Sequence, residues 1–378
     1  MSPEVLIFTV PGDEHAEAVY WGLAQLGITT YIWFPSDFPD DASASISITP
    51  KSNQYQGCLS GINGVAELDD VKVFWPRRLS LPKPPFLSDI RDAAIVESEC
   101  RTHLNGMMCV IDQYSCSINA FHSRSRADLK IYQLIWAIKS GLTILDTLFS
   151  NSAYDVTEFI GVRQVCVGKA HKPAGWQTQE GQFSQLTYVL PDSRDIHPQA
   201  IAACPIIVQP LVEREYEVRV IIFGSSVHVV RTCDARQDGH IDGRYQANLD
   251  NFESYVSVNA PDDVIVGCKK YMSALDLKFG AFDFIIDSEG NWLFLECNEA
   301  GQFLFIEQIV SSINLLDDFC KWIFLKCKGT EYVGDVQLKL ADFCSFTENL
   351  DYRSPVIASK DIPRSSRFVD ERTFHFDH

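Results

Sequence analysis

Residues 279–307 read FGAFDFIIDSEGNWLFLECNEAGQFLFIE, and this stretch decides how the rest of the chain is interpreted. Residues 281–287 and 292–298 alternate strictly in character, and the polar residues 288–291 separate them. Alternation on both sides of a short polar turn predicts a β-hairpin. If residues 288–291 form the loop, Asp283 lies directly opposite Glu296.

The two faces of this hairpin are expected to differ. The face predicted to enter the core carries Phe282, Phe284, Ile286, Leu293, Leu295 and Cys297, and the other carries Asp283, Ile285, Phe294, Glu296 and Asn298. Opposed carboxylates repel each other unless a cation lies between them. Two carboxylates and an amide oxygen suit Mg²⁺, which usually also takes substrate phosphates. Spacing alone leaves open a plain solvated hairpin with scattered acidic residues.

Composition narrows the classes of protein to consider. The chain has 378 residues, enough for two or three domains, and 46% of them are hydrophobic. We find no apolar run long enough to span a membrane and no signal peptide. The formal net charge of −18 argues against nucleic acid or an anionic membrane as a general partner.

The cysteines indicate a compartment. All 12 are scattered without CxxC pairs, mostly in apolar contexts. We therefore expect reduced thiols in the core of a cytoplasmic protein, with a metal cluster or a disulfide framework as the alternative.

The N-terminal part has the pattern of an α/β domain. A strand at 4–10, a helix to about Leu26 and a strand at 28–34 form a βαβ start without GxGxxG. A turn-rich meander is expected at 35–64. The rest of this domain is predicted as a strand at 71–75, a helix of about 20 residues and a strand at 109–112.

Strands dominate the later part. After a helix at 128–140 and a helix or turn region at 147–161, we expect strands at 165–169, 186–190 and 206–212, and a hairpin formed by 217–223 and 226–231. A helix at 261–275 leads into the hairpin quoted above, and one helix is predicted from 305 to 328. Residues 329–378 are less periodic.

A few residues in this later part could carry chemistry. Lys169 ends a strand before a Gly-containing loop, where an ammonium can meet phosphate, although a structural lysine is also common there. Lys130 by itself indicates only a surface lysine. The backbone of residues 209–212 could pair with a purine edge. Glu217 and Arg219 alternate on a strand and should share a face.

The order of these features resembles the ATP-grasp ligases. It is most similar to the graspetide synthetases, microviridin-type enzymes that form macrolactones or macrolactams in ribosomal peptides. The residues that carry the resemblance are Asn119…Lys130, Lys169, "IIVQPLVEREYEVRV", "IDGR", Phe74-Trp75-Pro76-Arg77-Arg78, and Glu296-x-Asn298 followed by Gly301-Gln302. The resemblance covers roughly residues 4–325.

The resemblance implies an α/β ATP-grasp fold in several parts. It implies a pre-ATP-grasp α/β domain at 1–115, a central ATP-grasp subdomain at 116–205 and a C-terminal ATP-grasp subdomain at 206–328. Residues 329–378 would be an extension with no counterpart in the family.

The resemblance also implies roles for individual residues. ATP would be held by Lys130, Lys169, Gln209, Pro210, Leu211, Val212, Glu217, Ile285 and Phe294: the lysines on phosphates, 209–212 on adenine, Glu217 on ribose, and Ile285 and Phe294 on the purine face. Asp283, Glu296 and Asn298 would bind Mg²⁺. Arg219, Arg231 and Arg244 would neutralise the γ-phosphate and the acyl phosphate formed from it.

The implied reaction is ATP-dependent ring closure in a precursor peptide. An Asp or Glu carboxylate of the peptide would be phosphorylated, and a Ser, Thr or Lys side chain would displace the phosphate. The partner would be a leader-bearing precursor peptide, and the protein could form a homodimer. Two alternatives stay open: an ATP-grasp ligase that adds an amino acid to a peptide or protein terminus, and a non-catalytic domain that binds a nucleotide or peptide.

Overall fold

The computed structural model describes residues 2–49, 54–80, 82, 90–163, 165–172, 175–178, 181–184, 187–234 and 255–348. Within these ranges, no helix combines the length and the apolar character needed to cross a membrane.

The N-terminal part is built on a parallel sheet. Its strands follow the order β2-β1-β6-β7, and α1 (Glu14–Gln25) joins the first two along the chain. The strands are β1 (Val5–Phe8), β2 (Thr30–Trp33), β6 (Val73–Pro76) and β7 (Cys116–Ser117). β1 and β6 are buried throughout, as expected for parallel strands covered on both faces. The predicted βαβ start is confirmed.

The predicted meander is also confirmed. After the short helix η1 (Pro35–Asp37), three antiparallel strands follow one another: β3 (Ser43–Thr49), β4 (Gln54–Gly61) and β5 (Gly64–Glu67).

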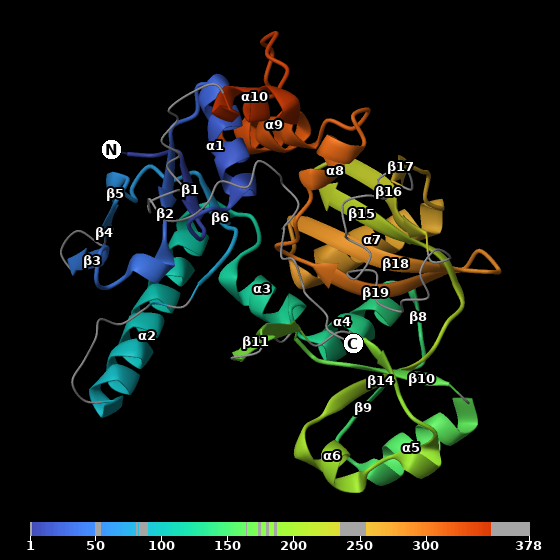
Figure 1. Cartoon of the computed structure of the whole chain (residues 1–378). Helices are drawn as coiled ribbons and strands as arrows, with labels where there is room; N and C mark the ends of the chain where they lie inside the picture. The colour runs from blue at the N-terminus through green and yellow to red at the C-terminus, as the bar shows by residue number, and fades with distance from the viewer. Residues whose placement is uncertain are drawn as a thin grey trace.

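The predicted strand at 109–112 is wrong. These residues lie inside the long helix α2 (Ile90–Tyr114), which projects from the N-terminal part (Figure 1). The buried residues Leu104, Met107, Met108 and Ile111 have helical spacing and enter one core cluster. A four-residue apolar run fits a buried strand or a buried helix equally well, and here the preceding turns settle it as a helix.

A small four-stranded sheet, with the order β13-β10-β14-β9, lies apart from the N-terminal part (Figure 1). It contains β9 (Leu148–Ser150), β10 (Cys166–Lys169), β13 (Tyr188–Val189) and β14 (Ile206–Pro210), and it packs against α5 (Ala153–Arg163) and α6 (Pro198–Ala203). The short helix η2 (Ser193–Asp195) and the hairpin of β11 (Gly175–Thr178) and β12 (Gly181–Ser184) complete this part. Region 147–161 is therefore a strand followed by a helix.

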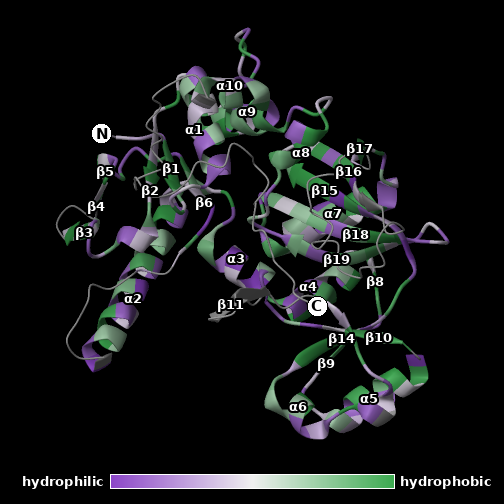
Figure 2. Ribbon diagram, in the orientation of Figure 1, coloured by the Kyte–Doolittle hydropathy of each residue, from purple (hydrophilic) through white to green (hydrophobic). Residues whose placement is uncertain are grey.

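The largest sheet has six strands in the order β17-β16-β15-β18-β19-β8. They are β8 (Thr143–Ile144), β15 (Arg214–Phe223), β16 (Ser226–Asp234), β17 (Val256–Ser257), β18 (Phe279–Asp287) and β19 (Trp292–Asn298). Both predicted hairpins, β15–β16 and β18–β19, are present. Figure 2 shows mostly hydrophobic residues along these strands.

Each face of this sheet has its own core. One face packs against α4 (Lys130–Lys139) and α7 (Asp262–Leu275), and the short helix α3 (Phe121–Ala127) precedes α4. The other face contributes Ile221, Phe223, Phe279 and Ala281 to a core shared with α1 and the N-terminal strands. The N-terminal sheet and the large sheet are therefore packed through one hydrophobic cluster.

The single helix predicted at 305–328 is wrong in its continuity. Two helices, α8 (Phe305–Ile309) and α9 (Leu315–Lys328), are separated by a turn at Val310, whose backbone is not helical. The buried Glu307 carboxylate accepts hydrogen bonds from the amides of Leu316 and Leu340, which fixes this turn. α9 and α10 (Leu340–Glu348) lie beside α1, so the C-terminal helices return to the N-terminal part (Figure 1).

Candidate functional site

Three strands bring charged side chains into one row. Asp283 on β18 pairs directly with Glu296 on β19, as the sequence predicts. On its other side, Asp283 pairs with Arg219 on β15. Paired residues of neighbouring strands point to the same face of a sheet, so the three side chains are neighbours. Asn298, two residues beyond Glu296, shares this face.

Each carboxylate has its own basic partner. Arg219 binds Asp283 through two hydrogen bonds, from Nε to Oδ1 at 2.8 Å and from Nη2 to Oδ2 at 3.0 Å. Lys130 Nζ forms an ion pair with Glu296 Oε2. The Asn298 amide nitrogen bridges the two acids, at 3.0 Å from Asp283 Oδ2 and 3.0 Å from Glu296 Oε1. The repulsion expected between the acids is thus offset by two cations and one amide.

Burial and the neighbouring charges act in opposite directions on the pKa values of this cluster. Burial disfavours an ionised Glu296, but Lys130 and Asn298 outweigh it and hold the pKa of Glu296 below its ordinary value. Burial alone would lower the pKa of Arg219, but the bidentate pair with Asp283 raises it. For Asp283, burial raises the pKa and Arg219 opposes that shift. Glu296 and Arg219 are therefore charged at neutral pH.

The position of Lys130 follows from the docking of α4. Gln133, one turn further along, is buried and accepts a hydrogen bond at 3.0 Å from the amide of Cys297. Its amide nitrogen donates to the carbonyl of the same cysteine at 3.2 Å. These two hydrogen bonds to the β19 backbone hold the start of α4 beside Glu296.

The cluster also fits a divalent cation. The described residues contain no group of three or more His, Cys, Asp or Glu side chains suited to a metal. Asp283, Glu296 and Asn298 instead offer two carboxylates and one amide, a small hard-oxygen set that leaves room for phosphate oxygens. Turning over the Asn298 amide would present its oxygen to a cation.

Asn119 ties the two ends of the hairpin together and is completely buried. Its side chain donates to the carbonyls of Phe279 at 2.8 Å and Glu299 at 2.7 Å. It accepts from the amides of Lys278 at 2.6 Å and Phe279 at 3.1 Å. In the sequence, Asn119 stands out only as part of a motif. A lone asparagine before a helix gives no sign of four such bonds across 160 residues.

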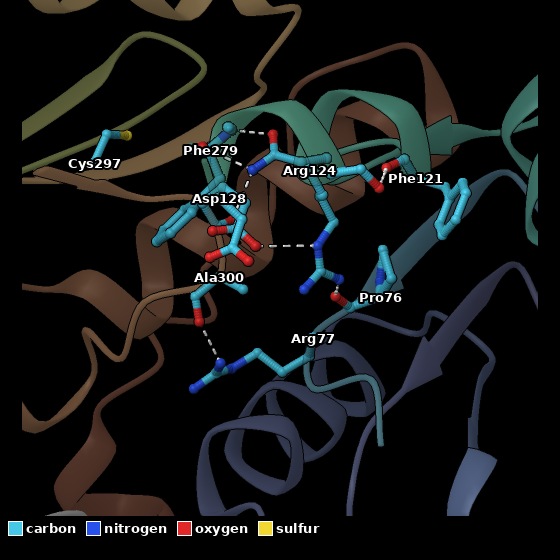
Figure 3. Close-up of polar contacts among 12 residues, drawn as sticks. Pro76, Arg77, Phe121, Arg124, Asp128, Phe279, Cys297 and Ala300 are labelled. Carbon is cyan, nitrogen blue, oxygen red and sulfur yellow. Dashed lines mark hydrogen bonds and ion pairs between the residues drawn. The ribbon is translucent and has the colours of Figure 1, made fainter. Parts of the chain in front are cut away.

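Arg124 connects the same region to the N-terminal sheet. Its Nε lies 3.3 Å from Glu299 Oε1, and Nη1 donates to the carbonyl of Pro76 at the end of β6, as Figure 3 shows. Nothing in the local sequence pattern distinguishes Arg124 from its neighbour Arg126.

The predicted position of Phe294 is wrong. A β-bulge between Asp283 and Phe284 shifts the register, so that Phe294 pairs with Phe284 and Leu293 pairs with Ile285. Phe294 is completely buried and packs against Tyr271, Phe282 and Phe284 in the core beneath the sheet. Leu293 takes the place beside Ile285 that was expected for Phe294. Strict alternation cannot anticipate one extra residue in a strand.

Arg231 is also misplaced in the prediction. It pairs with Val218, which belongs to the core on the opposite face of the sheet from Arg219. Its guanidinium lies 4.5 Å from the ring centroid of Tyr216. The described structure therefore does not bring Arg231 to the Asp283–Glu296 cluster. Arg244 lies outside the described residues.

Two of the remaining predicted residues, Glu217 and Ile285, share the face of the sheet that carries the cluster. Glu217 pairs with Ile285 across β15 and β18, on the face that carries Arg219 and Asp283. The Glu217 carboxylate forms an ion pair with Arg214.

The other predicted residues lie on or next to the small sheet. Lys169 is the last residue of β10 and pairs with Ile207, and Gln209 and Pro210 belong to β14. Gln209 is buried and donates from Nε2 to Thr147 Oγ1 at 2.9 Å. Leu211 is 42% exposed and its amide donates to the carbonyl of Val165. Val212, partly buried, follows on the segment that leads into β15.

Comparison with known proteins identifies the fold. No family model and no curated protein matches the chain. Solved structures do match, among them a RiPP-associated ATP-grasp ligase from Chryseobacterium gregarium, in complex with ADP and a leader and core peptide. It has a TM-score of 0.77 and 20% identity, over 87% of this chain and 98% of that one.

Two further solved structures are similar to this chain over most of its length. The macrocyclase MdnC from Microcystis aeruginosa, bound with precursor peptide MdnA, gives a TM-score of 0.72 at 20% identity over 86% of this chain and 99% of that one. The ATP-grasp ligase PsnB, complexed with a phosphomimetic variant of its minimal precursor, Mg and ADP, gives 0.67 at 17% identity over 87% and 100%. The chain therefore has the ATP-grasp fold of these ligases, as its sequence predicts.

Proposed function

We propose that this protein is an ATP-dependent ligase that closes rings in a ribosomally made precursor peptide. One observation carries the proposal: Asp283, Glu296 and Asn298 converge with Arg219 and Lys130 on one face of an ATP-grasp sheet. The similar structures contain ADP, Mg and precursor peptides, which supports ATP, Mg²⁺ and a leader-bearing peptide as the ligands here.

The proposed ATP site has two ends. Asp283, Glu296 and Asn298 hold Mg²⁺, which supplies positive charge to the phosphates. Lys130 and Lys169 bind phosphate oxygens. At the other end, the backbone of residues 209–212 meets adenine, Glu217 meets the ribose, and Ile285 with Leu293 provides the apolar wall for the purine. Arg244 stays a proposed partner of the transferred phosphate.

Arg219 is the described residue best placed for the charge that develops during transfer. Its guanidinium is fixed by Asp283 and by the carbonyl of Gln302, to which Nη1 donates at 3.2 Å. A cation held in place before reaction lowers the barrier without further reorganisation. The guanidinium also matches the geometry of both carboxylate and phosphate.

The proposed chemistry has two steps. A carboxylate oxygen of an Asp or Glu side chain attacks the γ-phosphorus, and the bond to the β–γ bridging oxygen breaks, giving an acyl phosphate and ADP. A Ser or Thr hydroxyl, or a Lys amine, of the same peptide then attacks the acyl carbon. Phosphate leaves and the nucleophile loses a proton, which yields an ester or amide ring. Both reacting groups belong to one bound peptide, so proximity supplies much of the second step.

The overall charge constrains how the peptide is recruited. At −18 the protein repels an acidic peptide at long range. Local arginines and contacts with the leader must therefore outweigh that repulsion at short range, within about 8 Å at physiological salt.

The parts of the chain fit this function as follows. We propose a pre-ATP-grasp domain at 1–115, a central subdomain at 116–205, a C-terminal subdomain at 206–328 and an extension from 329, in a cytoplasmic protein. A homodimer is compatible with this division.

Mass spectrometry of the peptide tests the proposal. The peptide encoded beside the gene is incubated with the protein, ATP and Mg²⁺, and its intact mass is measured together with ADP release. Ring closure predicts loss of one water molecule per ring. A gain of one amino-acid residue would instead identify a ligase that extends a peptide terminus. No ADP release with the cognate peptide would support a non-catalytic binding domain.

A further inference from the structure

The loop at 299–304, which directly follows Asn298, is held by side chains from three other parts of the chain. Asn119 donates to the carbonyl of Glu299 at 2.7 Å, and Arg219 donates to that of Gln302 at 3.2 Å. Two further contacts come from the N-terminal sheet and its helix. Arg77 Nη1 donates to the carbonyl of Ala300 (Figure 3), and His15 Nε2 accepts from the amides of Phe303 and Leu304, each at 3.1 Å.

His15 is in the protonation state that this role needs. It lies in the first turn of α1 and is 2% exposed. Burial and the nearby Arg77 lower the pKa of His15 to about 3, although Asp13 opposes them. The ring is therefore neutral, and Nε2 keeps the lone pair that the two loop amides use.

Burial of the Arg77 guanidinium costs free energy of folding, so a contribution to stability does not by itself explain this residue. Arg77 directly follows β6, is 2% exposed, and its Nε lies 3.8 Å from Asp13 Oδ2. Within the described part of the chain, Nε and Nη2 have no hydrogen-bond partner. A buried donor left without a hydrogen-bond partner destabilises the folded state. The hydrogen bond from Nη1 to the Ala300 carbonyl links the N-terminal part to the loop.

We propose that His15 and Arg77 are positioning residues for the nucleotide site, so that the N-terminal α/β part sets the geometry of the Mg²⁺ and γ-phosphate end. The inference rests on the proposed function, since it assigns a role within the same site. The loop links directly to that end: Asn298 precedes it, and its Gln302 carbonyl orients Arg219. The adenine end, on residues 209–212, has no contact with this loop through the bonds described.

The two ends of the site predict a selective defect. Displacing the loop should misplace Asn298 and Arg219 but leave the adenine wall intact. A displacement of about 1 Å can lower a rate about 100-fold. We therefore expect weaker binding of the Mg²⁺-dependent triphosphate and a lower kcat, with little change in the affinity for Mg²⁺-free ADP.

Two variants and two conservative rescues test the inference by calorimetry. The probes are AMPPNP with Mg²⁺ and ADP with EDTA, each titrated into the full-length protein. Arg77→Met is combined with Asp13→Asn so that no buried charge is left alone. His15→Leu removes the acceptor. Both should lower the affinity for Mg²⁺–AMPPNP by about tenfold while ADP affinity changes less than about twofold. Arg77→Lys and His15→Gln, which keep a donor or an acceptor, should restore the wild-type ratio.

Arg101→Met is the matched control, since Arg101 is exposed on α2, where it forms an ion pair with Glu97. It should leave both affinities unchanged. If the variants bind both probes with the wild-type ratio, or lose both affinities together with their thermal stability, Arg77 and His15 are structural and the inference is wrong. If the wild-type protein binds neither probe, the proposed function itself is refuted.

Discussion

Asp283 and Glu296 face each other across the β18–β19 hairpin, yet each is neutralised from a different direction. Arg219 reaches Asp283 from the neighbouring strand, and Lys130 reaches Glu296 from the start of α4. A cation that binds both acids must share them with these two side chains. The two ion pairs therefore predict how the site responds to substitution and to pH.

The magnesium assignment predicts loss of turnover on removing one carboxylate. Glu296→Gln should lower ATP-dependent modification of the precursor peptide by at least about 100-fold, because a charged ligand of the transferred phosphate's cation is lost. Thermal unfolding should change little, since glutamine has nearly the volume of glutamate and removes the repulsion between Glu296 and Asp283. Glu289→Gln, at the exposed hairpin turn, is the control and should be fully active. Retained activity in Glu296→Gln would refute the metal assignment.

The Lys130–Glu296 pair predicts a shift in the pH profile. Burial works to raise the pKa of Glu296, and Lys130 is the main group that lowers it. Without Lys130 the carboxylate protonates at a higher pH, so Lys130→Met should move the acidic limb of the rate profile upward. Lys139→Met, on the same helix and stacked on Trp136, should leave that limb in place. An unmoved limb in Lys130→Met would contradict the pair.

His15 predicts a loss of stability in mild acid. Its pKa is 6.5 in an unfolded chain and about 3 in the folded protein, so only the unfolded state binds a proton between these values. Its contribution is complete above pH 6.5 and falls by about 1.4 kcal/mol for each pH unit below that. Denaturant unfolding of the wild type and of His15→Gln, above and below pH 6.5, measures the difference between their free energies of unfolding. Parallel pH dependences would show that His15 titrates normally, despite its burial and the nearby charges of Asp13 and Arg77.

The β-bulge predicts different effects at two apolar residues of the hairpin. Phe294→Ala should lower the free energy of unfolding by about 3–5 kcal/mol, because the ring is buried in the core. In the folded variant, ADP affinity should be close to that of wild type. Ile285→Ala, on the cluster face, should weaken ADP binding several-fold with a smaller loss of stability. Calorimetry and denaturant unfolding of both variants check this; a reversed pattern would restore Phe294 to the purine wall.

Local patterns predicted a large part of this molecule. The opposed pair of Asp283 and Glu296 follows from the alternation and loop length of one hairpin, and the shared face of Glu217 and Arg219 follows from the alternation of another. The ATP-grasp fold was implied by the resemblance of these motifs to a known family, and the solved structures confirm it. Each of these features depends on neighbouring residues, which is why the sequence was sufficient.

The failures have a common origin in tertiary packing. One extra residue at a bulge sends Phe294 into the core, and packing on α2 turns the apolar run at 109–112 into helix. Asn119 and Arg77 act on the loop at 299–304 from far away in sequence. Such contacts leave no periodic signal, because a single polar residue carries each of them.

Transfer of a heavy oxygen isotope tests the central claim most directly, namely that this site activates a peptide carboxylate with ATP. The precursor peptide is synthesised with heavy oxygen in its Asp and Glu carboxyl groups and incubated with the protein, ATP and Mg²⁺, and the released phosphate is weighed by mass spectrometry. An acyl phosphate predicts that each ring closed delivers one heavy oxygen to phosphate. Phosphate without the label, beside a modified peptide, would contradict the account.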